Sequence, residues 1–425
     1  MKQSLTMKPM ACALLCMVLM TAASCKPADA QPIPTQAPTQ VMTAAPENTT
    51  TVAPVISTQL PEITPIKSTN GHEVRVVFIN VGKGDAALVQ MDGKNYLIDT
   101  GTAESTPAFF GALNLCGVQK LDAVFLTHTH SDHIGGMELL GQNYAVDQIY
   151  AGFYSENKKD GTNKITTLAE QLSLPLTRLT AGEMIPLNGD VCFEVLGPRT
   201  LCNDDNDNSL VLRLVVNETV LLFAGDMQFE EEQLLLDAGA NLASDVLKVG
   251  NHGNPDATGD GFAKQVHPKI AVISTDTKVD TDSANPRVIA ALGDAQILTT
   301  QDYTRGILLT IPAHGEMPVA QALAEKPADL QLSILSVDLE TQMATIRNDG
   351  QTADLSGCIL LSERGGEAFR FPSGSVVASG KTVTVSGAGG GGDYTFIGEK
   401  KPWSKKKTDT ALLYDQYGNK LAEKF

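Results

Sequence analysis

The chain has 425 residues, enough for two or three domains, and its 42% hydrophobic and 19% charged residues are typical of a folded globular protein. Its 32 basic and 49 acidic side chains give a formal net charge of −17, which argues against a bulk electrostatic grip on nucleic acid. Residues 326–425 carry 12 basic and 12 acidic side chains, so the acidic excess lies in the first 325 residues. Any contact with a polyanion is therefore favoured at the C-terminal end over the rest of the chain. Only one apolar stretch approaches the length of a bilayer, and it is N-terminal, which excludes a polytopic channel or transporter.

The N-terminal segment has the features of a secretory signal peptide. Two lysines in residues 1–8 precede a short apolar run that ends in small residues. The sequence Ala22-Ala23-Ser24-Cys25 resembles the bacterial lipobox, in which the cysteine receives a lipid after cleavage. We therefore expect a signal peptide over 1–25, lipidation at Cys25, and an exported lipoprotein on the outer face of a bacterial cell that contacts the membrane only through this anchor. The alternatives are an ordinary signal peptide with a chance cysteine, which gives a secreted protein, or a single membrane helix.

Composition divides the rest of the chain into two folded parts and two linkers. Residues 26–70 are rich in Pro, Thr, Ala and Gln, which predicts a disordered linker. Short β-branched runs mixed with helical stretches, such as 227–237 and 262–266, predict an α/β domain over 71–312, with its site residues at the strand ends. A second linker is expected over 313–328. Residues 329–425 have the pattern of a small β-sandwich, with short strands separated by glycine-rich turns.

The strongest chemical signal follows the strand expected over 121–126. Three of the seven histidines fall within six residues, beside an aspartate, in the run Thr127-His128-Thr129-His130-Ser131-Asp132-His133. His128 and His130, two apart in an extended turn, can hold one cation, and Asp132 and His133 can turn toward a second. Imidazole and carboxylate ligands suit Zn²⁺, with Mn²⁺ or Fe as alternatives. The alternative without function is a solvated polar loop.

Further ligands are expected at the ends of later apolar runs. Asp226 follows the run 221–225, where it can bridge two cations, although Gly-Asp after a strand is often only a turn. His252 follows another apolar run and is flanked by glycines. Asp85 and Asp99, at the ends of early strands, are expected to orient ligand imidazoles or to be purely structural.

These residues resemble the metallo-β-lactamase superfamily, whose hallmark is the His-x-His-x-Asp-His motif. The segments 78–85, 97–101, 208–214 and 247–250 make the resemblance closest to the hydrolase domain attached to ComEC-type DNA-uptake proteins. The resemblance covers about 73–312. It implies an αββα sandwich of the α/β class that binds two cations, most simply Zn²⁺. The implied ligands are His128, His130, Asp132, His133, Asp226 and His252. Transport is not implied, because the membrane channel of the uptake proteins is absent.

Three departures from the family pattern bear on activity. The middle histidine ligand of the lactamases is missing, so water or Asn208 would complete the coordination of the first cation. Asn251 stands where the branch has the first histidine of a His-His pair, and Asn285 where it has a histidine before proline. These losses leave open a non-catalytic surface-binding protein built on a degraded hydrolase scaffold.

The resemblance implies a metal-dependent hydrolase of phosphodiesters in nucleic acid or nucleotides, acting through a hydroxide that bridges the two metals. Asp132 and Asp226 are the expected catalytic carboxylates, and Asn208 and Asn251 are expected beside the ligands or the substrate. The acidic catalytic half suits short or single-stranded substrates better than long duplex DNA. A phosphodiester of the cell wall, such as phosphocholine-bearing teichoic acid, is the enzymatic alternative.

Residues 329–425 resemble the lamin-tail domain, an immunoglobulin-like all-β sandwich. The segments that carry this resemblance are 343–348, 354–357, 371–374 and 403–418. Five lysines between 400 and 407 surround Trp403, which allows a polyanion or cell-surface contact through charge and stacking. The alternative is that Trp403 packs inside the sandwich and the lysines are a solvated loop, and this is the interpretation that we favour.

Overall fold

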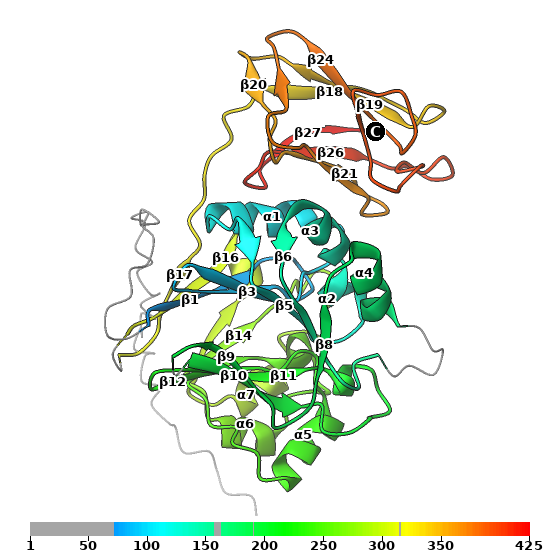
Figure 1. The fold of residues 1–425 in the computed structure, drawn as a ribbon. Coiled ribbons are helices and arrows are strands. Elements are labelled where there is room, and N and C mark those ends of the chain that lie inside the picture. The colour runs from blue at the N-terminus through cyan, green and yellow to red at the C-terminus, as the bar shows by residue number, and fades with distance from the viewer. Residues whose placement is uncertain (1–71, 157–162, 190, 314–315) are drawn as a thin grey trace, which may run out of the picture. The chain divides into compact units, whose positions relative to one another are not determined.

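The computed structural model describes residues 72–156, 163–189, 191–313 and 316–425. The expected signal peptide, Cys25 and the first linker lie outside the described residues. An α/β part is followed along the chain by an all-β part (Figure 1).

The α/β part contains two large sheets. The first consists, in spatial order, of β17 (Val319–Ala322), β16 (Gly306–Ile311), β1 (Val74–Ile79), β2 (Ala87–Met91), β3 (Lys94–Ile98), β5 (Ala123–Leu126), β7 (Ile149–Gly152) and β8 (Leu176–Leu179). The second consists of β15 (Gln296–Thr299), β14 (Ile270–Ile273), β13 (Val246–Lys248), β12 (Thr219–Phe223), β11 (Val211–Val216), β10 (Val191–Gly197) and β9 (Met184–Asn188). A separate two-stranded ladder joins β4 (Lys120–Leu121) to β6 (Ala145–Val146).

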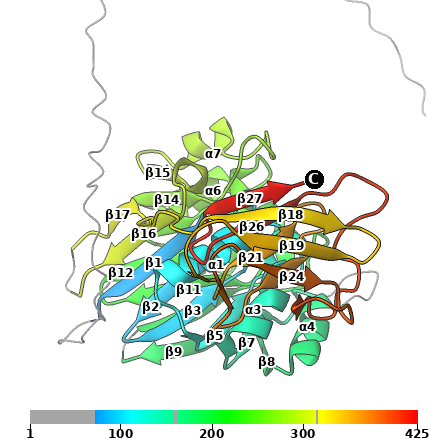
Figure 2. The same ribbon diagram turned by 90° about the horizontal axis from the view of Figure 1, so that it is seen from above.

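Helices cover the outer face of each sheet (Figures 1 and 2). Those packed on the first sheet include α1 (Thr106–Leu115), α3 (Met137–Asn143) and α4 (Lys164–Leu172), and the short α2 (Ser131–Ile134) follows β5. Those packed on the second sheet are α5 (Phe229–Asp237), α6 (Asp260–Val266) and α7 (Pro286–Ala291). Three 3₁₀ turns complete this part: η1 (Asn206–Asn208), η2 (Gly250–Gly253) and η3 (Thr300–Asp302). None of the described helices is long and apolar enough to cross a membrane.

The strands are nearly continuous apolar runs because both faces of each sheet are buried. In β1, Val76 and Phe78 point into the core between the two sheets, whereas Val77 and Ile79 point into the core under α1 and α3. The inner core also contains Phe193 and Phe223 from the second sheet. These cores form an αββα sandwich, as the resemblance implied.

The all-β part is a sandwich of two four-stranded sheets. The first is β18 (Leu332–Asp338), β19 (Met343–Asn348), β24 (Thr382–Ser386) and β25 (Tyr394–Thr395). The second is β22 (Ala368–Arg370), β21 (Ile359–Ser362), β26 (Ala411–Tyr414) and β27 (Lys420–Lys424), and β20 (Ala353–Asp354) pairs with β23 (Val376–Val377). Trp403 is 1% exposed in the core between the sheets, so it is not available to stack on a ligand.

Two sequence expectations differ from the structure. The segment expected as a linker over 313–328 contains β17, because Val319–Ala322 adds an antiparallel edge to β16 through backbone hydrogen bonds that need no apolar pattern. The helix expected from Met227 begins at Phe229 instead, since Met227 and Gln228 belong to the turn after β12. The four cysteines of the described ranges, Cys116, Cys192, Cys202 and Cys358, are free thiols.

Candidate metal centre

Six metal-ligand candidates meet where ends of the two sheets come together. His128 and His130 lie in the turn after β5, and Asp132 and His133 lie in α2, which follows that turn. The second sheet supplies Asp226 just after β12 and His252 in η2, just after β13. The strands end at neighbouring positions because β12 and β13 pair in parallel, with Phe223 opposite Lys248.

Asp226 is the centre of this cluster. Its Oδ2 lies 3.1 Å from Nε2 of His133, 3.3 Å from Nε2 of His252 and 3.8 Å from Nε2 of His128. Oδ2 of Asp132 lies 3.4 Å from Nε2 of His252. Two groups of convergent ligand atoms share Asp226: one with His128 and His130, the other with Asp132, His133 and His252.

The donor atoms fit a pair of cations better than a hydrogen-bonded network. Four of the ligand atoms are buried, yet they make no hydrogen bond with a residue that the structure describes. They are Nε2 of His128, His133 and His252, and Oδ1 of Asp226. In a tetrahedral zinc site with ligands about 2.0–2.1 Å from the metal, neighbouring ligand atoms are about 3.3 Å apart. The distances from Oδ2 of Asp226 to Nε2 of His133 and of His252, 3.1 and 3.3 Å, are close to this value, whereas the distance to His128 is longer at 3.8 Å. Buried polar atoms without partners are also costly. The His and Asp residues therefore form a cluster that fits bound metal cations.

Asp99 fixes the orientation of one ligand. Its Oδ2 accepts a hydrogen bond from Nδ1 of His133 at 2.8 Å, which leaves Nε2 of that ring facing Asp226. The same carboxylate accepts hydrogen bonds from the backbone N–H of Thr127 at 2.8 Å and from its hydroxyl at 2.7 Å. Asp99 is placed there because β3 and β5 run in parallel, so their ends lie side by side. The carboxylate thus ties the ligand turn to the first sheet and sets the tautomer of His133.

His252 is oriented by the backbone rather than by Asp85. Its Nδ1 lies 2.9 Å from the carbonyl oxygen of Ser274, to which it donates, so that Nε2 faces the cluster. Asp85 stands 3.7 Å from the same Nδ1 and instead pairs with Lys248, whose Nζ is 2.5 Å from its Oδ2. Lys248 and Asp85 are both buried beneath the metal centre. The expectation that Asp85 orients an imidazole directly is therefore not what the contacts show.

The charges of the cluster are strongly coupled. Burial lowers the pKa of His252, but the facing carboxylates of Asp226 and Asp132 outweigh burial and raise that pKa to about 9. Burial likewise opposes protonation of His133, yet Asp226 and Asp99 hold its pKa well above the usual value. Burial and the neighbouring His133 hold the pKa of His128 well below its usual value. Protons on His133 and His252 thus stand where cations would bind, so metal binding must release them.

The three asparagines singled out in the sequence have structural partners. The side-chain amide of Asn208 bonds to the backbone of Cys202 and Asp204, so it holds its own loop together and does not complete the coordination of a cation. The carboxylate that this loop brings near the centre is Asp205, whose Oδ2 lies 4.0 Å from Nε2 of His130. Asn251 donates to Asp256 at 2.9 Å. Asn285 caps α7 by accepting a hydrogen bond from the backbone N–H of Arg287.

Sequence reasoning missed three polar residues at the centre. Lys83 donates to Oδ2 of Asp132 at 2.8 Å, Lys248 neutralises Asp85, and the hydroxyl of Ser209 accepts from the backbone N–H of Asp226 at 3.1 Å. A signal existed for Lys83, a charged residue between two glycines just before a candidate site aspartate. Lys248 ends an apolar run, and nothing in the sequence indicates that its charge is buried.

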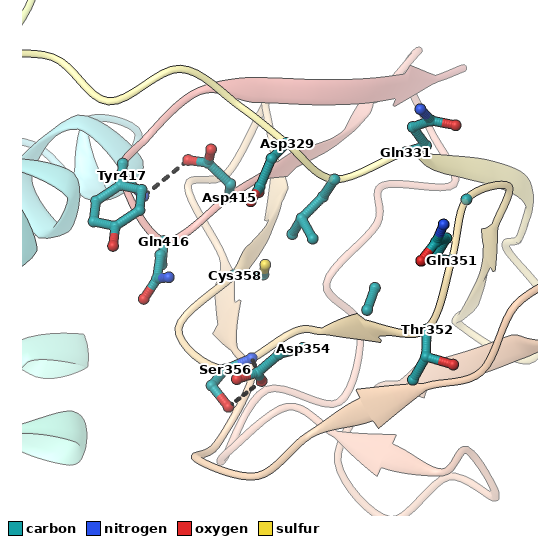
Figure 3. Close-up of a pocket in the computed structure, with 13 residues that line it drawn as sticks. Asp329, Gln331, Gln351, Thr352, Asp354, Ser356, Cys358, Asp415, Gln416 and Tyr417 are labelled. Carbon is teal, nitrogen blue, oxygen red and sulfur yellow. Dashed lines mark hydrogen bonds between the residues drawn. The ribbon is translucent and has the colours of Figure 1, made fainter.

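A cavity lies wholly within the all-β part, apart from the metal-ligand cluster. It measures about 680 Å³ and includes Asp354 and Asp415 in its wall (Figure 3). Both carboxylates hold their own turns: Asp354 accepts hydrogen bonds from the backbone and hydroxyl of Ser356, and Asp415 accepts from the backbone of Tyr417 and Asn419. This cavity therefore shows no arrangement comparable to the metal centre.

Comparison with known proteins agrees with this geometry. Residues 79–277 match the family described as the metallo-beta-lactamase superfamily. The chain is 32% identical over 223 residues to ComE operon protein 3 of Bacillus subtilis, covering 48% of this chain and 28% of that protein. It is 34% identical over 210 residues to competence protein ComA of Neisseria gonorrhoeae, covering 48% and 27%. The chain thus spans about a quarter of the length of these relatives.

Among solved structures, a diphosphatase from the PhnP family is 17% identical, with a TM-score of 0.36, covering 56% of this chain and 97% of that one. Residues 79–277 form a metallo-β-lactamase superfamily domain whose homologues include competence proteins.

Proposed function

We propose that this protein is an exported, metal-dependent hydrolase that cleaves phosphodiesters. The observation that carries the proposal is the convergence of six ligands on two positions that share Asp226. When two cations are bound, they would supply a hydroxide at neutral pH and stabilise charge on the reacting phosphoryl oxygens. Two adjacent cations that share a carboxylate suit in-line displacement at phosphorus.

The chain's own residues prepare the centre for this chemistry. Asp226 and Asp132 supply the carboxylates between and beside the cations, and Asp99 keeps Nε2 of His133 free to bind. Four of the six ligand candidates are at most 2% exposed, namely His128, His133, Asp226 and His252. His130 and Asp132 are partly exposed, so the centre opens toward solvent on their side. A buried, preorganised centre strengthens the electrostatic effect of the cations on a substrate.

The charge around the opening favours a small substrate over a long duplex. A cavity beside the metal-ligand candidates is lined by one lysine, Lys83, and by three acidic residues, Glu104, Asp132 and Asp276. Acidic side chains therefore outnumber the lysine there. A polyanion would meet repulsion at this rim, whereas a nucleotide or a short single strand presents fewer phosphates. The same acidic rim favours the second candidate, a cell-wall phosphodiester with a cationic substituent, such as phosphocholine on teichoic acid.

A degraded, non-catalytic scaffold is the less favoured interpretation. Asn251 and Asn285, the residues in its favour, have roles in the local structure, and all six ligand candidates remain in place.

We further propose that Cys25 carries the lipid anchor and that residues 329–425 are a lamin-tail domain. Its lysines at 400–407 would offer a polyanion or cell-surface contact, without stacking by the buried Trp403.

The function is tested with the purified full chain and bis(p-nitrophenyl) phosphate, after loading with Zn²⁺ or Mn²⁺. We expect metal-dependent release of nitrophenol that is lost in the double variant Asp132→Ala, His133→Ala. The matched control is Asp294→Ala, an exposed aspartate after α7 that should leave activity unchanged. Two bound metals without hydrolysis would point to another ester or amide as substrate. Absence of both metal and hydrolysis would refute the enzymatic proposal.

A further inference from the structure

Lys83 places a positive charge at the open side of the metal centre. Its Nζ donates to Oδ2 of Asp132 at 2.8 Å, and its side chain is 34% exposed. A second lysine near the centre, Lys248, is 4% exposed and pairs with Asp85. Of these two lysines, only Lys83 can therefore reach a molecule that enters from solvent.

The loop that carries Lys83 is fixed against the ligand turn. Gly84 has φ +156°, and a Cβ at this position would lie 2.6 Å from the carbonyl oxygen of Asp132. The backbone N–H of Asp85 donates to that same oxygen at 3.0 Å. On the other side of Lys83, Gly82 has φ +73° and its N–H donates to the side chain of Asn80 at 3.1 Å. The backbone on both sides of Lys83 is thus held, and only its side chain is free to change partner.

The side chain borders a cavity of a size suited to a small ligand. The cavity measures about 720 Å³, within the range of about 300–1,000 Å³ typical of ligand sites. Besides Lys83 and Asp132, its wall includes the hydroxyl-bearing residues Thr102, Ser105 and Ser131. Glu104 and Asp276 also line it, so the cavity joins three carboxylates, one of them a metal-ligand candidate, with a single lysine and neutral hydrogen-bonding groups.

We propose that Lys83 is a substrate-binding residue that donates to a non-bridging oxygen of the phosphodiester. This inference rests on the proposed function. Without a cation, Asp132 is balanced by Lys83 and by His252, whose Nε2 lies 3.4 Å from the same oxygen. With a cation held by Asp132, that carboxylate would no longer need Lys83, and the ammonium group would be available to an incoming anion. Lysine suits this exchange because its flexible stem carries a compact charge with three donors, which binds phosphate oxygens well.

The test measures phosphate binding and catalysis separately in the zinc-loaded full chain. Lys83→Gln removes the charge, Lys83→Arg keeps it, and Lys94→Gln removes an exposed lysine at the far end of the β2–β3 hairpin. We expect Lys83→Gln to bind inorganic phosphate about 10- to 100-fold more weakly and to lower kcat/KM for bis(p-nitrophenyl) phosphate by a similar factor, as expected for loss of one charge-assisted hydrogen bond. Lys83→Arg should retain most of both, and the zinc content should stay the same in every variant.

Two outcomes would overturn the inference. In the first, Lys83→Gln binds phosphate and hydrolyses the diester as well as the parent protein does, and it binds zinc more tightly. Lys83 would then serve only to neutralise Asp132. The inference also fails if the zinc-loaded parent does not bind phosphate. If the parent binds phosphate in a manner that depends on Lys83 but does not hydrolyse the diester, the proposed function fails and the assignment of Lys83 as a phosphate-binding residue stands.

Discussion

The substitution Asp99→Asn tests whether this carboxylate sets the protonation of a metal ligand. Asp99 is fully buried and accepts three hydrogen bonds of 2.7–2.8 Å, two from Thr127 and one from Nδ1 of His133. Asparagine has nearly the same shape and tolerates the positive φ of 57° at this position. Its amide would donate to Nδ1 of His133, however, and move the ring proton to Nε2, where a cation must bind. Loss of such an orienting partner typically weakens metal binding 10- to 100-fold, or about 1.4–2.7 kcal/mol.

The metal-free protein should also lose stability. Asp226 and Asp99 together raise the pKa of His133 in the folded state, so its protonated form stabilises the fold below the unfolded pKa of about 6.5, and this effect is lost as pH rises through the folded pKa. Asp99→Asn removes the part of this effect that comes from Asp99. Removal of one partner of a buried pair costs about 3–5 kcal/mol, so the loss should be largest near pH 6. Zinc affinity is measured by competition with a chromophoric chelator, and stability by urea denaturation of the apoprotein.

The control for Asp99→Asn is Asp122→Asn, which removes an acceptor of the Asn95 backbone N–H away from the metal centre. It should leave zinc affinity unchanged. Unchanged zinc affinity in Asp99→Asn itself would refute the argument that Asp99 sets the tautomer of His133.

Three further predictions address the support around the centre. Lys248→Met should lower the free energy of unfolding by about 3–5 kcal/mol in urea denaturation, because it leaves Asp85 charged and buried. Adding Asp85→Asn should recover part of this loss. An equal loss in the single and double variants would contradict a buried pair. Apparent zinc affinity should rise between pH 6 and 9, because the pKa of His252 is raised to about 9 and its proton must leave; a flat chelator-competition profile would show that no proton is displaced. Gly84→Ala should destabilise the protein by about 1–3 kcal/mol and weaken zinc binding, because its Cβ collides with the carbonyl of Asp132; unchanged thermal unfolding and zinc content would argue against the close approach.

Much of the α/β fold follows from local sequence signals. Apolar β-branched runs such as the one at β1 predict buried strands, because both faces of such a strand must be covered. An edge strand is harder to predict from the sequence. The edge strand β17 escaped prediction because its backbone pairs with β16 while its side chains remain largely exposed, so no apolar pattern marks it.

The sequence by itself determined the composition of the metal centre. The cluster His128 to His133 is local, and its residue types and spacing predict metal ligands because imidazole and carboxylate groups are the donors that Zn²⁺ prefers. Asp226 and His252, expected at the ends of later apolar runs, are brought by the structure to the same place.

Only the tertiary structure decided how these ligands are supported. The parallel pairing of β3 with β5 brings Asp99 to His133, and the meeting of the two sheets brings Lys248 to Asp85. The same packing turned Asn208 toward its own loop and placed Lys83 over Asp132. Such pairings depend on the register and approach of strands far apart in the chain, and no local pattern of residues encodes them.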